Sequence, residues 1–134
     1  ASILKTTQMG QVGIRAVMPY AVRQELKDAL RSQLNEYSSI EQEAHEIATS
    51  RGWELKELDP AAKIMSKVCA RSNLMVGRSD SKIAAMMIQG NTRGMIKGLK
   101  NTHHCDRLDS AIGALSQKLM DCETANIKQM QGYV

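Results

Sequence analysis

Three neighbouring residues, His103, His104 and Cys105, are the side chains of this 134-residue chain best suited to metal chemistry. Imidazole and thiolate groups are ligands that suit copper, zinc and nickel. The three residues fall at an expected turn before the last helix, and the sequence offers no second cluster that would complete a tetrahedral site. They are kept as candidate metal ligands, but a polar turn whose imidazoles complement the carboxyl end of the preceding helix explains them more simply.

No arrangement in the chain is typical of nucleophilic or acid–base catalysis. His45 is expected on the flank of a helix, and Cys105 does not face His104 because sequence neighbours on a helix point apart. The nine methionines and three cysteines suit Cu(I), but methionine is far commoner as a core filler. The sequence therefore predicts that the protein is not an enzyme and needs no cofactor.

Four polar residues fall at the centre of two expected inner helix faces: Gln33, Tyr37, Cys122 and Asn126. They could line a degenerate metal pocket that now binds a small polar ligand. A hydrogen-bonded core network is the preferred interpretation, because buried polar groups usually satisfy one another.

Glycine recurs at four-residue intervals along the expected helix 81–101, at Gly90, Gly94 and Gly98. Each glycine costs a helix roughly 1 kcal/mol relative to alanine, so the stripe predicts close packing, either within one bundle or between two copies. Ile88, Met95 and Leu99 form a second apolar strip on the same helix. Apolar character on two sides predicts a symmetric homodimer through this helix.

The same helix carries a basic face without any acidic residue, formed by Lys82, Arg93, Lys97 and Lys100. Such a face could bind nucleic acid or an anionic surface, but it has no aromatic side chains for base stacking. A solvated face, or pairing with the acid-rich second helix through Glu36, Glu43 or Glu46, is the simpler explanation.

Apolar periodicity positions these residues on helices over 2–18, about 23–51, 60–76, 81–101 and a last helix capped by Asp106. Leucine, isoleucine, alanine and methionine supply the apolar volume, and no strand pattern competes. Two hairpins with a short crossover helix between the second and third main helices predict one domain, 1–134, an up-down four-helix bundle of the ferritin-like kind.

Cysteines 69, 105 and 122 are odd in number and widely spaced, so the sequence suggests no disulfide framework. The longest apolar run, 83–88, is far too short to span a membrane, and no signal peptide is evident at the amino terminus. These features favour a cytoplasmic protein.

The run 87–96, Met-Ile-Gln-Gly-Asn-Thr-Arg-Gly-Met-Ile, resembles a group of small, uncharacterised ferritin-like proteins of Firmicutes-type bacteria. The resemblance implies a fold more than an activity. Ferritin-like metal proteins use Glu-x-x-His ligand pairs, whereas Gln42, Lys100 and Asn101 stand three residues before the histidines here. Residues 1–24 and 81–105 also contain no carboxylate.

The sequence thus predicts a non-catalytic helical bundle that acts as a structural or protein-interaction module. The first alternative is a metal-binding or metal-storage bundle with non-standard ligands. The second is nucleic-acid or anionic-surface binding through the basic face.

Overall fold

The computed structural model describes residues 2–52, 79–105 and 110–134, and these parts of the chain are helical without a β-strand. The main helices are α1 (Ser2–Val17), α2 (Gln24–Arg51), α4 (Asp80–Cys105) and α5 (Ser110–Gln131), with a 3-10 helix, η1 (Met18–Tyr20), after α1. The prediction of an all-α chain with four main helices is confirmed. The expected crossover helix over 60–76 and the expected cap Asp106 lie outside the described residues.

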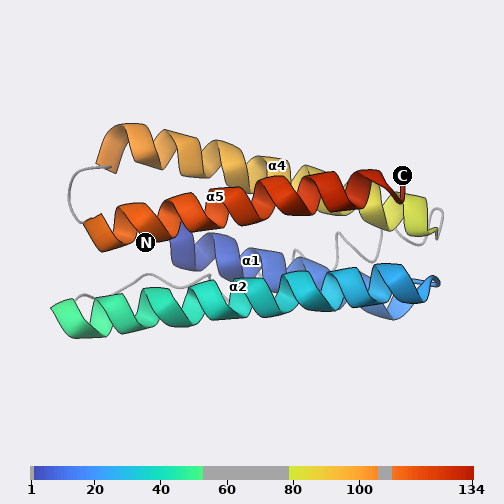
Figure 1. Cartoon of the computed structure of the whole chain (residues 1–134), viewed down its shortest axis with the longest axis horizontal. Coiled ribbons are helices and arrows are strands. Elements are labelled where there is room, and N and C mark those ends of the chain that lie inside the picture. Colours follow the sequence, from blue (N-terminus) through green and yellow to red (C-terminus); the bar gives the residue numbers. More distant parts are fainter. Residues whose placement is uncertain (1, 53–78, 106–109) are drawn as a thin grey trace.

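The four helices form a bundle in which each one packs against two others (Figure 1). α1 pairs with α2 and α4 pairs with α5, while α1 also borders α4 and α2 borders α5. α2 and α4 therefore lie on one diagonal of the bundle. α1 and α5 run in one direction and α2 and α4 in the other, so every neighbouring pair is antiparallel. α2 ends at one end of the bundle and α4 begins at the opposite end.

The helix ends follow from local sequence. Pro19 lies in η1, where its fixed φ and missing N–H end the regular α1 hydrogen bonding. Gly52 closes α2 in the left-handed region at φ 67°, and its N–H bonds to the carbonyls of Ala48 and Thr49. Glycine adopts this conformation without the steric cost that a side chain would add.

The start of α4 is tied to the start of α2. The Ser79 hydroxyl accepts a hydrogen bond from the Lys82 N–H at 3.1 Å, which is the contact of an N-cap. The neighbouring Asp80 carboxylate instead accepts the N–H groups of Val22 and Arg23 at 2.8 and 2.9 Å. One side chain thus joins the two hairpins at this end of the bundle.

The core is aliphatic at its most buried positions. Its largest fully buried apolar side chains are Leu4, Ile14, Leu26, Leu30, Ile40, Ile83 and Met130. Burying each large aliphatic side chain contributes roughly 1.5–3 kcal/mol to folding. Across the described residues, no helix combines the length and apolar character needed to cross a membrane. The buried polar side chains are exceptions in this aliphatic core.

Candidate functional site

A hydrogen bond crosses the diagonal of the bundle at its middle. The Tyr37 hydroxyl, on α2, donates to Asn91 Oδ1, on α4, at 2.5 Å. Both side chains are buried, and Asn91 Nδ2 in turn donates to the Met87 carbonyl at 2.8 Å. The Tyr37 ring lies against Gly10 of α1, where an added Cβ would come within 2.7 Å of Cε2. The tyrosine therefore fixes the relative height of three helices.

Glu123 of α5 is only 1% exposed and lies beside Tyr37 in the middle of the bundle. We call the buried polar side chains there, Gln33, Tyr37, Asn91, Glu123 and Asn126, the polar layer. The Glu123 carboxyl group occupies the space above Gly94 of α4, where a Cβ would stand 2.0 Å from Oε1. No side chain fits at Gly94 unless Glu123 moves. The glycine therefore makes room for a buried acid from the neighbouring helix.

Burial raises the pKa of Glu123 to about 8, and a hydrogen bond with Tyr37 opposes this rise in part. At neutral pH the carboxyl group is mostly protonated and can donate a proton to an acceptor. A hydrogen bond lowers the pKa of a carboxyl group when it is donated to the carboxylate, so Tyr37, whose O–H donates to Asn91 Oδ1, is also the donor toward Glu123 once that group ionises. Burial, and then the nearby Glu123 charge, raise the pKa of Tyr37 far above its ordinary value, so this hydroxyl also stays protonated.

Two buried polar atoms of this layer have no hydrogen-bond partner within the described part of the chain: Glu123 Oε2 and Gln33 Oε1. Gln33 is 1% exposed, and its Nε2 donates to Gln129 Oε1 at 3.0 Å, which links α2 to α5. An unpaired buried acceptor costs roughly 1–3 kcal/mol of folding free energy.

Cys122 lies at the edge of the polar layer and is half-buried. Its thiol donates to Glu36 Oε2 at 2.7 Å, and Asn126 Nδ2 donates to its sulfur at 3.6 Å. Burial, with the hydrogen bond to Glu36, raises the pKa of Cys122 to about 12. A thiol that stays protonated is a poor nucleophile and a poor metal ligand, so we expect Cys122 to be unreactive.

A shallow groove of about 420 Å³ runs between α2 and α5 beside this thiol, lined by Glu36, Ser39, Ile40, Lys118, Asp121, Cys122 and Ala125. Lys118 Nζ reaches across it to Glu43 at 3.0 Å. A smaller hollow of about 120 Å³ lies beside the hydrogen bond from Gln11 to Glu41. Neither hollow brings a histidine together with acidic or thiol groups.

The four residues of the predicted inner polar cluster are placed unequally. Gln33, Tyr37 and Asn126 are fully buried, whereas Cys122 is only half-buried. Glu123 and Asn91 also belong to this buried polar set, although the sequence pattern did not single them out. Glu123 falls four residues after Leu119 and three before Asn126, so helical periodicity places it on the inner face. Glutamate is rarely buried, so its residue type gives no signal of an inner position.

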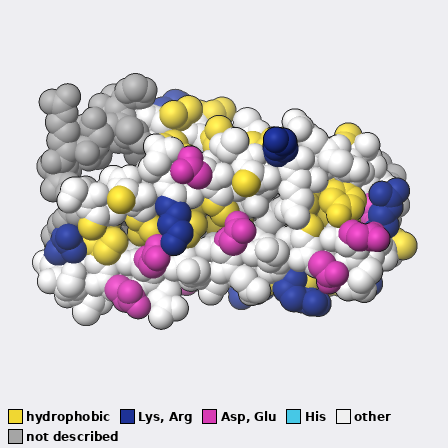
Figure 2. Space-filling view, viewed as in Figure 1, with side chains coloured by type: hydrophobic (Ala, Val, Ile, Leu, Met, Phe, Trp, Pro, Cys, Tyr) yellow, Lys and Arg dark blue, Asp and Glu magenta, His cyan; other side chains and the backbone are white. Residues whose placement is uncertain are grey.

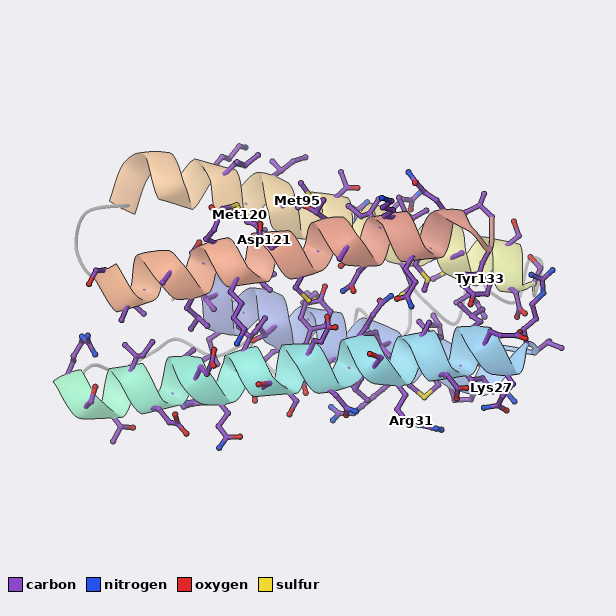
Figure 3. The ribbon with its side chains drawn as sticks, viewed as in Figure 1. Lys27, Arg31, Met95, Met120, Asp121 and Tyr133 are labelled. Atoms are coloured by element: carbon purple, nitrogen blue, oxygen red, sulfur yellow. The ribbon has the colours of Figure 1, made fainter. Side chains whose placement is uncertain are left out.

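The glycine stripe has two different environments. Gly94 receives Glu123, and a Cβ at Gly98 would stand 2.9 Å from Met120 Cγ, whereas nothing lies within 4 Å of a Cβ at Gly90. Met120 of α5 and Met95 of α4 lie along the line where these two helices meet (Figure 3). Gly94 and Gly98 thus serve packing inside one chain, so any contact between copies must use other residues.

The basic face is open to solvent at Arg93, Lys97 and Lys100, while Lys82 is half-buried. These four residues form no ion pair with another described residue. The expected pairing with Glu36, Glu43 or Glu46 is wrong within these parts of the chain, because α2 lies diagonally opposite α4. The ion pair of Glu43 is with Lys118 of α5 instead.

The candidate metal ligands lie on a helix rather than in a turn. α4 continues to Cys105, so the backbone of 103–105 is helical. His45 is exposed on α2. Among the described residues, no three histidine, cysteine or acidic side chains come close enough to share a metal ion.

Comparisons with protein-family models, with characterised proteins and with solved structures find no significant match to this chain.

Proposed function

We propose that this chain is a non-catalytic helical bundle that acts as a structural or protein-interaction module in the cytoplasm. The observation that carries the proposal is the filling of the bundle centre by Tyr37, Asn91 and Glu123, which are all buried. Burial raises the pKa of Glu123, the one acid of this set. Di-metal bundles instead place carboxylates from all four helices there.

The donor set argues against a metal at this centre. α1 contains no carboxylate, and the only acid of α4, Asp80, is bound to the backbone at the start of α2. Glu123 would have to lose a proton that its burial retains, because metal ions bind the carboxylate form. The thiol of Cys122 meets the same obstacle.

The proposal includes a ferritin-like arrangement. Its support is the direction of the helices, with two antiparallel hairpins and with α2 ending at the end of the bundle opposite the start of α4 (Figure 1). A connection that returns along the bundle is the feature that separates this arrangement from a simple sequence of hairpins.

Elemental analysis of tag-free protein purified without chelators tests the proposal. We expect iron, manganese, zinc and copper each well below one atom per chain. A near-stoichiometric metal would overturn the proposal, and Glu123→Gln would then show whether the bundle centre holds it. A metal retained by that variant would direct the search to His103, His104 and Cys105.

The exposed bases on α4 favour a second candidate function, the binding of nucleic acid or another polyanion. Arg93, Lys97 and Lys100 lie within two helical turns and form no ion pair with other described residues. Retention of a DNA duplex that weakens steeply as salt rises would support this function. If no complex forms even at low salt, it is excluded.

A further inference from the structure

Charge is separated between the two diagonal helices of the bundle. Residues 32–50 of α2 contain four acids, Glu36, Glu41, Glu43 and Glu46, and no lysine or arginine. Residues 81–105 of α4 contain four bases and no acid. Because α2 and α4 do not border one another, their outer sides face away from each other across the bundle. Figure 2 shows acidic side chains along α2, at the bottom of the view.

The two charged surfaces also lie at the same height. α2 and α4 run in the same direction, and the hydrogen bond from Tyr37 to Asn91 joins residues 54 positions apart. Glu43 and Lys97 have the same separation in sequence, as do Glu46 and Lys100. Since both helices rise about 1.5 Å per residue, each lysine is level with its matching glutamate on the far side of the molecule.

We propose that the acidic side of α2 binds the basic side of α4 in a second copy of this chain. A copy moved sideways without rotation brings Lys97 and Lys100 opposite Glu43 and Glu46. The contact joins two different surfaces, and repeated translation does not close, so it builds an open row of molecules. This inference rests on the proposed role as an interaction module and names its partner.

The groups that the contact needs are accessible. Glu46 is exposed, with only a 3.4 Å contact to Gln42. The Glu43 side chain is 41% exposed but already pairs with Lys118 of α5, so a lysine of the second copy has to share this carboxylate with Lys118 or replace it. Ile96 and Leu99 flank the lysines of α4 and are 48% and 49% exposed. These two apolar side chains add area that the contact can bury next to its ion pairs.

A symmetric dimer through α4 is disfavoured by the same charges. A two-fold axis that crosses α4 near Lys97 sets Arg93, Lys97 and Lys100 against the same three residues of the partner. Like charges placed opposite one another at an interface repel, whereas the translated contact pairs opposite charges. The charges therefore favour the row over the dimer.

Light scattering and sedimentation of the whole chain, over a range of concentration and salt, test the inference. We expect association that grows with concentration and weakens as salt rises. Reversing two charges on α4, with Lys97→Glu and Lys100→Glu, should weaken association roughly ten-fold or more. Reversing the matching charges on α2, with Glu43→Lys and Glu46→Lys, should do the same.

Mixing the two reversed proteins supplies the decisive result. The first has two acidic sides and the second two basic sides, so the mixture should associate although neither protein does so alone. A control with Lys5→Glu and Lys128→Glu makes the same change in net charge on exposed positions of α1 and α5, and should associate like the native chain. Circular dichroism of every variant verifies that it folds.

Three outcomes would overturn the inference: a native chain that stays monomeric, a closed dimer indifferent to the reversals, or a mixture that stays monomeric. A monomer that binds a DNA duplex and loses it on reversal of α4 would assign the basic face to nucleic acid instead. Metal content measured on the same samples tests the proposed function separately, because a metal-loaded protein overturns that function whatever its state of association.

Discussion

Gly94 and Gly90 are one turn apart on the same helix, yet they have opposite surroundings. A Cβ at Gly94 would stand 2.0 Å from the Glu123 carboxyl group, and a Cβ at Gly90 would meet nothing within 4 Å. One glycine is required by a neighbouring helix and the other is not. Equal spacing of the glycines therefore does not imply an equal role. On the inner side of α4 the space left by α5 requires a residue without a side chain, whereas the outer side of α4 carries basic residues.

Gly94→Ala should have the largest effect. The new methyl group displaces Glu123, and overpacking of this kind costs typically 1–3 kcal/mol, which exceeds the roughly 1 kcal/mol that alanine gains in helix propensity. We expect the free energy of unfolding to fall by up to about 2 kcal/mol, as measured by urea denaturation.

A double variant sharpens this result. Removing the carboxyl group with Glu123→Ala frees the space that Gly94→Ala needs, so the two losses should add to more than the loss in the double variant. Strict additivity would mean that Gly94 and Glu123 do not interact.

Glu123→Gln should change how stability depends on pH. Between the ordinary pKa of 4.5 and the folded value of about 8, the folded state holds a proton that the unfolded state has released. The free energy of unfolding of the native chain therefore falls as pH rises through this window and levels off above it. The glutamine variant lacks this fall, so its stability relative to the native chain should increase by up to roughly 4 kcal/mol from pH 5 to pH 9.

Urea denaturation of both proteins at pH 5, 7 and 9 measures this difference. Asp121→Asn, at an exposed acid on the same helix, serves as the control and should leave the slope unchanged. Parallel pH profiles for the native chain and Glu123→Gln would show that Glu123 is ionised in the folded protein.

Tyr37→Phe removes the hydroxyl that joins α2 to α4. The loss of a buried hydrogen bond, with Asn91 left short of a donor, should lower the free energy of unfolding by about 1–2 kcal/mol. The hydrogen bond with Tyr37 lowers the pKa of Glu123, so its removal should also extend the pH-dependent fall to higher pH. Tyr133→Phe, at a half-buried tyrosine outside the polar layer, provides the control. Unchanged stability together with an unchanged pH profile would remove Tyr37 from the network.

Gly90→Ala should have the smallest effect and the opposite sign. Its Cβ enters open space, so the variant gains helix propensity without a clash and should be more stable by about 0.5–1 kcal/mol in thermal or urea denaturation. A loss of stability in this variant would show that Gly90, like Gly94, has no room for a side chain.

Much of the fold could be predicted because helix formation depends on local pattern. The 28-residue α2 ends at Arg51, where the periodicity predicted its end. Apolar periodicity likewise placed Gln33, Tyr37 and Asn126 on inner faces. Glu123 was missed, because its burial depends on a glycine of another helix and not on its own neighbours in sequence.

The sequence by itself determined the helices, their inner faces and the separation of acids from bases, because each of these depends on residues close together along the chain. The tertiary structure alone decided that Glu123 lies over Gly94, that Tyr37 reaches Asn91, and that the acidic and basic helices are diagonal and level. These features depend on which helices become neighbours and at what height, and helical periodicity fixes the facing side of each helix but not its partner.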